Sequence, residues 1–207
     1  MLHRIALFSL FASACDGGSD TSPADTSADT DETDLPVAFG VASPDFITDT
    51  DAGIEHDYDC HMALPVEFSC YNSNPEITWE GLPDGTTHLA LIFDDPTAGG
   101  FPHWAVYNVP ATETGLGQGI SGYAIETADL PEGAAELENG FEYMGYLGSC
   151  PGGINQYRWR LWALNAPLVA PVGGDAFDQY NDLADQADAA SIEMVEMCHV
   201  FDGADIP

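Results

Sequence analysis

From residue 39 onward, short apolar runs alternate with turn residues, a pattern that is typical of antiparallel β-structure. Such runs occupy residues 39–42, 66–69, 76–79, 88–93, 103–109 and 157–164. The run at 88–93 is apolar at successive positions, as in a central strand that is covered on both faces. It lies between two turn sequences, Asp84-Gly85 and Asp95-Pro96. The pattern predicts a mainly β (α+β) fold.

Residues 177–200 contain neither glycine nor proline and have a different spacing. Apolar side chains recur there at three- and four-residue steps, namely Leu183, Ala187, Ala190, Met194, Val195 and Cys198. This spacing would place them on one face of a helix, so we expect one or two C-terminal helices packed against the sheet. Met194 and Met197 are then expected in the core rather than as metal ligands.

The N-terminus has the features of an export signal. Arg4 precedes an apolar run of ten residues, 5–14, which is too short to span a bilayer and has the length of a signal-peptide core. The run ends in the letters ASAC, similar to a bacterial lipobox, with the cysteine at position 15. We therefore expect a signal peptide at 1–14 and lipidation of Cys15, with secretion of an unlipidated protein as the alternative.

Residues 16–36 are rich in Asp and Thr and contain no aromatic and no basic residue. Such a segment buries too little apolar surface to offset its chain entropy. We expect lipidated Cys15 and a disordered acidic linker over 15–36, followed by one folded domain over 37–207.

The charge balance excludes several partners. The chain has 35 acidic residues, three arginines and no lysine, which gives a net charge of −32. Nucleic acid is excluded because binding it requires a basic surface. An anionic membrane would repel the domain, so membrane attachment is expected only through the lipid anchor, in the cell envelope.

Four cysteines follow Cys15, namely Cys60, Cys70, Cys150 and Cys198. In an oxidising compartment this even number suggests one or two disulfides, and three complete pairings are possible. His56, Cys60 and His61 fit no recognised zinc spacing, so we expect no metal.

The runs at 88–93 and 103–109 are close in sequence and are expected to pair as neighbouring strands. This pairing would bring Asp95 close to His103. A carboxylate beside an imidazole raises the proton affinity of the histidine, so His103 is expected to be partly cationic and to donate to an anion. A structural hydrogen bond between the two is the alternative.

Residues 145–153 form a glycine-rich loop just before the strand near Tyr157. Its backbone N–H groups could form a nest for phosphate or carboxylate, or the loop could be an ordinary turn. Because side chains alternate along a strand, Arg158 and Arg160 should point away from the face that Tyr157 occupies. An anion would then be held by N–H groups, His103 and Tyr157 without a fixed positive charge, so we expect weak binding.

Five segments make a resemblance specific. They are 64–70 (LPVEFSC), 74–79 (NPEITW), 85–96 (GTTHLALIFDDP), 103–110 (HWAVYNVP) and 148–151 (GSCP). In order and spacing this set resembles the phosphatidylethanolamine-binding proteins, whose bacterial branch is described as Raf kinase inhibitor-like. The resemblance covers about residues 39–200 and implies a large central antiparallel sheet, a smaller second sheet and C-terminal helices.

The resemblance also implies a pocket for phosphate-like or acetate-like groups. The positions that match it are Asp95, Pro96, His103, Gly148, Ser149, Cys150, Pro151, Asn155 and Tyr157. Two residues depart from the family pattern. Thr97 stands where a second aspartate is common, and Asn155 stands where a histidine is common. An amide cannot become cationic, which would weaken phosphate binding.

Three functions follow as hypotheses. The first is an exported binding or regulatory module for a small anion, a phospholipid head group or an acidic side chain of a partner protein, with no cofactor and no enzymatic activity. The second is inhibition of a protease or kinase through the surface. The third is a hydrolase that uses Asp95 and His103 with Cys150 or Ser149, but the chain has no Gly-x-Ser-x-Gly elbow.

Overall fold

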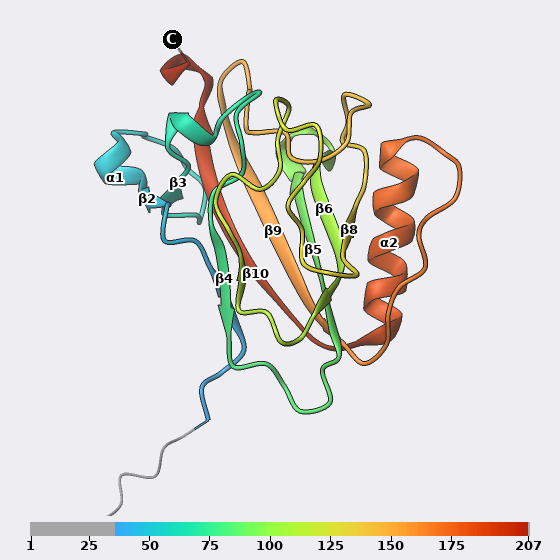
Figure 1. The fold of residues 1–207 in the computed structure, drawn as a ribbon. Coiled ribbons are helices and arrows are strands. Elements are labelled where there is room, and N and C mark those ends of the chain that lie inside the picture. The colour runs from blue at the N-terminus through green and yellow to red at the C-terminus, as the bar shows by residue number, and fades with distance from the viewer. Residues whose placement is uncertain (1–35, 207) are drawn as a thin grey trace, which may run out of the picture. The chain divides into compact units, whose positions relative to one another are not determined.

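The structure is a computed structural model that describes residues 36–206, and these contain two β-sheets and one long helix (Figure 1). The strands are β1 (Gly40–Ala42), β2 (Ile47–Thr48), β3 (Met62–Ala63), β4 (Ile77–Glu80), β5 (His88–Asp95), β6 (Phe101–Pro110), β7 (Gly115–Leu116), β8 (Ala135–Glu136), β9 (Ile154–Leu164) and β10 (Ser191–Asp202). The α-helices are α1 (Asp49–Ala52) and α2 (Ala176–Ala190), and the 3₁₀ turns are η1 (Val66–Phe68), η2 (Pro96–Ala98) and η3 (Gly203–Asp205).

The larger sheet has seven strands in the order β2-β3-β10-β9-β5-β6-β8. Its neighbouring strands pair antiparallel except β3 and β10, which are parallel. The smaller sheet has the order β1-β4-β7 and covers one face of the larger sheet, whereas α2 covers the opposite face (Figure 1). The expected fold class, a mainly β protein with two sheets, is confirmed.

Two hydrophobic cores lie on the two faces of the larger sheet, because alternate residues of each central strand point to opposite sides. In β5, Leu89, Leu91 and Phe93 belong to the core under the smaller sheet. Ala90 and Ile92 belong to the core under α2. The prediction that 88–93 is a central strand covered on both faces is therefore confirmed.

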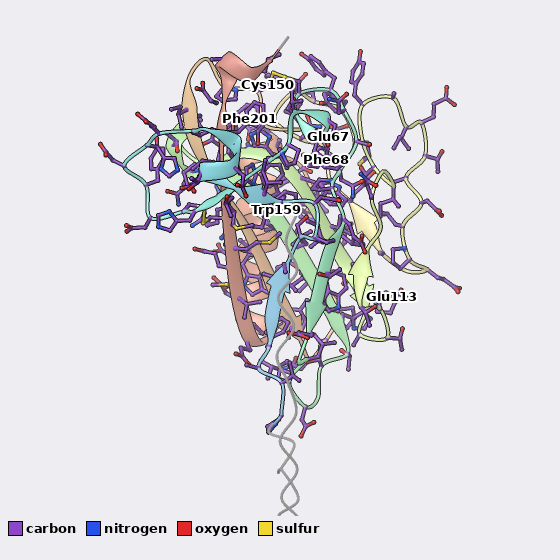
Figure 2. The ribbon with its side chains drawn as sticks, turned by 90° about the vertical axis from the view of Figure 1, so that its left-hand side faces the viewer. Glu67, Phe68, Glu113, Cys150, Trp159 and Phe201 are labelled. Atoms are coloured by element: carbon purple, nitrogen blue, oxygen red, sulfur yellow. A yellow bond between two sulfur atoms is a disulfide. The ribbon has the colours of Figure 1, made fainter. Side chains whose placement is uncertain are left out.

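Trp159 of β9 lies near the centre of the core under the smaller sheet, and Figure 2 shows it in the middle of the molecule. Its ring stacks on Phe93 with a centroid distance of 4.0 Å and an interplanar angle of 5°. Burying two large rings removes a large apolar area from water and holds β5 and β9 in a fixed register. In that register Phe93 is opposite Trp159 and Asp94 is opposite Arg158.

The prediction of helix over the whole of 177–200 is half wrong. Residues 176–190 form α2, which agrees with the expected one or two C-terminal helices, but residues 191–202 form the strand β10. Met194, Val195 and Cys198 therefore do not share a helical face. Three- and four-residue spacing also occurs by chance in a strand, and the pairing of β10 with β9 along its length decides the conformation.

The run at 66–69 is not a strand either. Residues 66–68 form the 3₁₀ turn η1, in which the N–H of Phe68 donates to the Pro65 carbonyl at 3.0 Å. The hydroxyl of Ser69 donates to the Val66 carbonyl at 2.7 Å. These local hydrogen bonds pair the backbone polar groups of the turn without a neighbouring strand. A short apolar run alone therefore does not distinguish such a turn from a strand.

Two disulfides connect segments that are far apart in sequence. Cys60 is bonded to Cys198, and Cys70 is bonded to Cys150. The sequence left three pairings open, and the structure selects this one. The first bond fixes the segment before β3 to β10, and the second fixes the segment after η1 to the glycine-rich loop.

The two arginines of the described chain lie on the α2 side of the sheet, as the alternation along β9 predicts. Arg158 donates to the two carboxylate oxygens of Asp94 at 3.0 Å and 2.6 Å. Arg160 donates to the same carboxylate at 3.0 Å. Asp94 is 5% exposed, so its charge depends on these partners for compensation.

Several expectations fall outside the described residues. The signal peptide at 1–14, the lipidation of Cys15 and nearly all of the acidic linker at 15–36 lie there. Among the residues that the structure does describe, no helix is long and apolar enough to cross a membrane.

The arginine pair predicts a stability effect. Replacing Asp94 by Asn leaves two guanidinium groups beside a neutral amide, and since both groups are partly exposed we expect the free energy of unfolding to fall by about 2 kcal/mol. Chemical denaturation measures this difference. The exposed Asp185 on α2 serves as the control, and its replacement by Asn should change stability by less than about 0.5 kcal/mol. Equal stability of both variants would show that the pair contributes nothing.

Candidate ligand-binding site

A hollow of about 160 Å³ lies where β5, β6 and β9 meet the glycine-rich loop. It is lined by Asp95, Ala98, Phe101, His103, Phe141, Leu147, Gly148, Cys150, Pro151, Asn155 and Tyr157. The hairpin expected from the sequence is present, because β5 pairs with β6 and only residues 96–100 connect them. This short connection places the end of one strand beside the start of the next.

Most of the residues predicted for the site lie on the wall of this hollow. They are Asp95, His103, Gly148, Cys150, Pro151, Asn155 and Tyr157. Two predicted residues do not line it. Pro96 is the first residue of η2, and Ser149 is fully buried behind the wall.

Both carboxylate oxygens of Asp95 already have partners. One accepts from the backbone N–H of Ala98 at 2.9 Å, which caps η2. The other accepts from the side-chain amide of Asn155 at 2.7 Å. Asn155, which stands where the family commonly has a histidine, therefore positions the acid rather than presenting a positive charge.

Thr97 stands at the other departure from the family pattern, and it connects η2 to β9. Its hydroxyl donates to the Gln156 carbonyl at 3.1 Å and accepts from the Gln156 N–H at 3.1 Å. The short turn that carries Asp95 is thus fixed to β9 by a side chain that has no charge.

His103 is buried and donates from Nδ1 to the Leu147 carbonyl at 2.8 Å. Burial lowers the pKa of His103 to about 4, although this hydrogen bond and the charge of Asp95 act in the opposite direction. The expectation of a partly cationic His103 is therefore wrong near neutral pH, because desolvation outweighs the carboxylate. The neutral ring offers Nε2 as a hydrogen-bond acceptor.

The glycine-rich loop does not form the expected nest at Gly148. The N–H of Gly148 donates to the Cys70 carbonyl at 2.7 Å, and the N–H of Cys70 donates to the Ser149 carbonyl at 3.0 Å. A Cβ on Gly148 would collide with the backbone of residues 68–70. Glycine is required here for close packing of two backbone segments, which the Cys70–Cys150 disulfide also joins.

Behind the wall, two rings and a hydroxyl form a buried hydrogen-bonded chain. The indole N–H of Trp159 donates to Nδ1 of His199 at 2.9 Å. Nε2 of His199 lies 2.9 Å from the Ser149 hydroxyl oxygen. Burial lowers the pKa of His199 well below its ordinary value, and the neutral ring then donates from Nε2 to Ser149.

This chain lies beside Tyr157, whose ring stacks on that of His199. Tyr157 lines the hollow, and its phenol O–H is a hydrogen-bond donor. Burial, followed by the charge of Asp95, raises the pKa of Tyr157, so this hydrogen is retained at physiological pH.

The sequence analysis did not identify several residues of the site. Phe101, Phe141 and Leu147 form apolar parts of the wall, and the sequence offered no polar signal for them. His199 was hidden by the incorrect helix at 177–200. Its ring stacks on Tyr157 at a centroid distance of 4.9 Å and an interplanar angle of 8°, which only the strand pairing of β9 and β10 creates.

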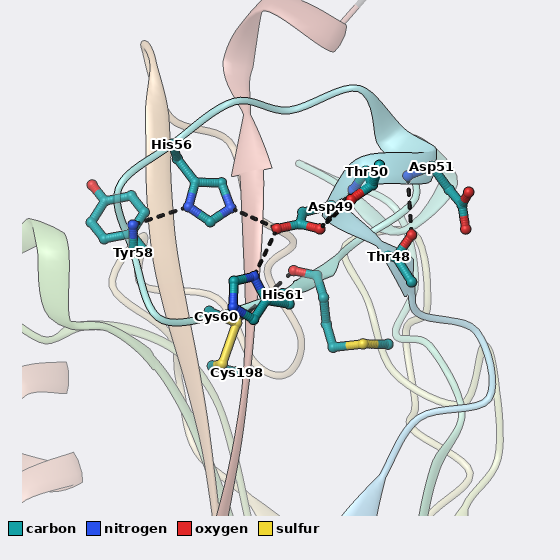
Figure 3. A network of polar contacts seen from close by, with 10 residues as sticks. Thr48, Asp49, Thr50, Asp51, His56, Tyr58, Cys60, His61 and Cys198 are labelled. Carbon is teal, nitrogen blue, oxygen red and sulfur yellow. Dashed lines mark hydrogen bonds and ion pairs between the residues drawn. A yellow bond between two sulfur atoms is a disulfide. The ribbon is translucent and has the colours of Figure 1, made fainter.

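A second polar cluster lies beside Asp49, the first residue of α1 (Figure 3). Oδ2 of Asp49 lies 3.4 Å from Nε2 of His56 and 3.1 Å from Nδ1 of His61. The hydrogen bond from His61 lowers the pKa of Asp49. Nδ1 of His56 accepts from the Tyr58 N–H at 3.0 Å, so Nε2 carries the hydrogen that faces Asp49.

This cluster connects the two ends of the segment 49–61, because Asp49 contacts both His56 and His61. Cys60 is bonded to Cys198 and offers no thiolate. Among residues 36–206, no group of three or more His, Cys, Asp or Glu side chains is arranged to hold a metal ion.

The fold and the hollow define a class of β-rich protein with one small polar cavity at the ends of its central strands. Residues 54–201 match the family described as phosphatidylethanolamine-binding protein. A UPF0098 protein of Methanothermobacter thermautotrophicus is 32% identical over 128 residues, which are 59% of this chain and 82% of that protein. The chain therefore belongs to the phosphatidylethanolamine-binding protein family.

Two further relatives are informative. Escherichia coli YbcL, whose crystal structure is described as that of a new member of the mammalian PEBP family, has a TM-score of 0.64 and 27% identity, covering 80% of this chain and 98% of that one. Mycobacterium tuberculosis LppC, which carries the name lipoprotein, is 36% identical over 133 residues, 60% of this chain and 60% of LppC.

The buried state of His103 predicts a pH dependence of stability. In the unfolded chain His103 has its ordinary pKa of 6.5, whereas in the fold its pKa is about 4. Lowering the pH from about 6.5 to about 4 therefore protonates the unfolded chain first and removes roughly 3 kcal/mol of stability.

Other groups also titrate between these pH values, so the contribution of His103 is measured as the difference between the wild type and a variant that lacks this histidine. Urea unfolding of the wild type and of His103→Gln is compared at pH 7.5 and at pH 4. The wild type should lose more stability than the variant, by the amount that His103 contributes. An equal loss in both proteins would mean that His103 is not held neutral by burial.

Proposed function

We propose that this protein is a binding module whose hollow takes a small acidic group, such as a phosphate, a carboxylate or a phospholipid head group, together with one proton. The observation that carries the proposal is that a hydroxyl donor and a neutral imidazole line the same hollow. Burial raises the pKa of Tyr157, so the phenol keeps its hydrogen, and burial lowers the pKa of His103 to about 4, so that ring is neutral near pH 7. An anion that enters would bring a negative charge close to His103 and raise its pKa.

The distribution of charge supports weak and proton-dependent binding. Asp95 is buried at the hollow, and the amide of Asn155 is already engaged with it. Arg158 and Arg160 are bonded to Asp94 on the opposite face. Among the residues described by the structure, none that lines the hollow carries a fixed positive charge, so a bound anion would depend on protonation of His103 for compensation.

We propose binding rather than turnover for this hollow. Cys150 is held in a disulfide with Cys70, so it is not available as a thiolate nucleophile. Ser149 is buried and its oxygen faces His199 rather than the hollow. A nucleophile within reach of both a base and a substrate is the arrangement that a hydrolase of this type requires.

We also propose that the chain is exported and anchored in the cell envelope through Cys15. The lipobox-like sequence before Cys15 and the lipoprotein name of the relative LppC support this. The two disulfides of the folded part are consistent with an oxidising compartment.

Proton uptake on anion binding is tested with sulfate, which does not titrate between pH 5 and pH 8. We expect its affinity to rise as the pH falls, by up to about tenfold per pH unit while His103 takes up one proton on binding. Isothermal titration calorimetry measures the affinity at constant ionic strength. In His103→Gln the pH dependence should disappear. Sulfate binding that is equal in the two proteins at every pH would overturn the proposal.

Asn155 stands where the family commonly has a histidine, and restoring that histidine gives a gain-of-function test. Replacing Asn155 by His adds a group that becomes cationic in the hollow, so we expect sulfate to bind about tenfold more tightly at pH 6. Asn181→His, on the exposed surface of α2, is the control and should leave the affinity unchanged. An equal gain in both variants would assign the effect to net charge alone.

Lipidation is tested by expression in a bacterial host with labelled palmitate. The wild type should incorporate the label and sediment with membranes. Cys15→Ser should lose both properties, because the thiol accepts the lipid. Membrane association that persists in the Cys15→Ser protein without the label would contradict the anchor.

A further inference from the structure

A second hollow, of about 470 Å³, has a wall made of aromatic residues alone. It is lined by Tyr71, Tyr123, Phe141 and Tyr143. Tyr71 is 55% exposed, Tyr123 is 62% exposed and Phe141 is 55% exposed, so packing of the core does not account for them. Large aromatic side chains that gather at the surface mark an interaction site more often than scattered single ones do.

Neighbouring tyrosine rings of this wall meet at steep angles rather than in parallel stacks. The centroids of Tyr71 and Tyr123 are 5.1 Å apart at an interplanar angle of 60°. Those of Tyr123 and Tyr143 are also 5.1 Å apart, at 77°. Rings that line one hollow at steep angles to each other can offer faces to a common occupant, as in an aromatic cage.

The backbone around this cage is held in place. Tyr71 follows Cys70, which is tied to the glycine-rich loop by its disulfide. The Tyr143 carbonyl accepts from the Asn139 N–H at 2.9 Å, and the Asn139 side-chain oxygen accepts from the Phe141 N–H at 3.0 Å. A cage that is already formed loses little entropy when an occupant enters.

Electrostatics favours a cation in this hollow. The faces of aromatic rings carry negative charge density, and the chain has a net charge of −32. Glu142 is exposed and lies in sequence between two residues of the wall. The two arginines of the described part are bound to Asp94 elsewhere, so no basic side chain of residues 36–206 competes for the rings.

We propose that the hollow of Tyr71, Tyr123, Phe141 and Tyr143 is a binding site for a quaternary-ammonium group. A primary ammonium group that enters a hollow lined by aromatic rings would lose some of its hydrogen bonds to water. A trimethylated ammonium has no N–H to desolvate and fills the space with methyl groups while keeping its charge. The site uses neither Asp95 nor His103, and Phe141 is the residue that lines both this hollow and the proposed acid-binding hollow.

The first test compares choline with 3,3-dimethyl-1-butanol, a neutral molecule of the same shape. Binding is followed by the NMR ring signals of the tyrosines in a sulfate-free buffer. We expect choline to bind and the neutral molecule to bind about tenfold more weakly, since it lacks the attraction between cation and ring. Equal affinities, or no binding of choline, would overturn the proposal.

The second test uses variants of an exposed ring that the acid-binding hollow does not contain. Tyr123→Leu removes the ring and should weaken choline binding about tenfold, whereas Tyr123→Phe keeps the ring and should change it by less than about twofold. Phe177→Leu, at an exposed aromatic residue of α2, is the matched control and should have no effect.

Circular dichroism checks that each variant is folded. Binding of sulfate to Tyr123→Leu should equal that of the wild type, so a failure of one proposal is distinguishable from a failure of the other. Choline binding that survives in Tyr123→Leu, or that falls equally in Phe177→Leu, would show that the cage is not the site.

Discussion

The alternation of side chains along β5 and β9 is the constraint on which the rest of the structure depends. Asp94 and Asp95 are neighbours in sequence but point to opposite faces of the sheet. Asp94 holds both arginines on the side of α2, and Asp95 faces the hollow with Asn155. A shift of one residue in the register would exchange these roles. The stacking of Phe93 on Trp159 makes such a shift costly, because both rings are fully buried.

This separation determines the chemistry of the hollow. The two arginines of the described chain form an ion pair with Asp94, so the hollow contains an acid, an imidazole that burial keeps neutral near pH 7, and a phenol. The buried chain from Trp159 through His199 to Ser149 lies beside the phenol of Tyr157. In the proposed function, selectivity for an acidic ligand depends on protonation of His103, whereas other anion sites use arginine or lysine.

The two disulfides have different consequences. Cys60–Cys198 fixes a surface segment in which His56 and His61 both contact Asp49 at the start of α1 (Figure 3). Cys70–Cys150 joins the backbone that carries Tyr71 to the loop that closes the acid-binding hollow. The second bond therefore supports both proposed sites, and in the folded chain it also keeps Cys150 unreactive.

The amino-acid sequence by itself determined the β-rich class, the central strand at 88–93, the hairpin that brings Asp95 close to His103, and the position of the arginines on the face of the sheet opposite Tyr157. These features follow from the period of two along a strand and from local turn residues, which act over short distances. The sequence motifs also led to seven residues of the hollow wall.

Only the tertiary structure decided the rest. The strand at 191–202, the partner of each cysteine and the use of the Gly148 N–H all depend on segments that are far apart in sequence. The prediction of a partly cationic His103 was wrong because its charge state also depends on segments that are far apart in sequence. A neighbouring carboxylate is visible in the sequence, whereas the desolvation that outweighs it exists only when the surrounding chain has folded around the ring.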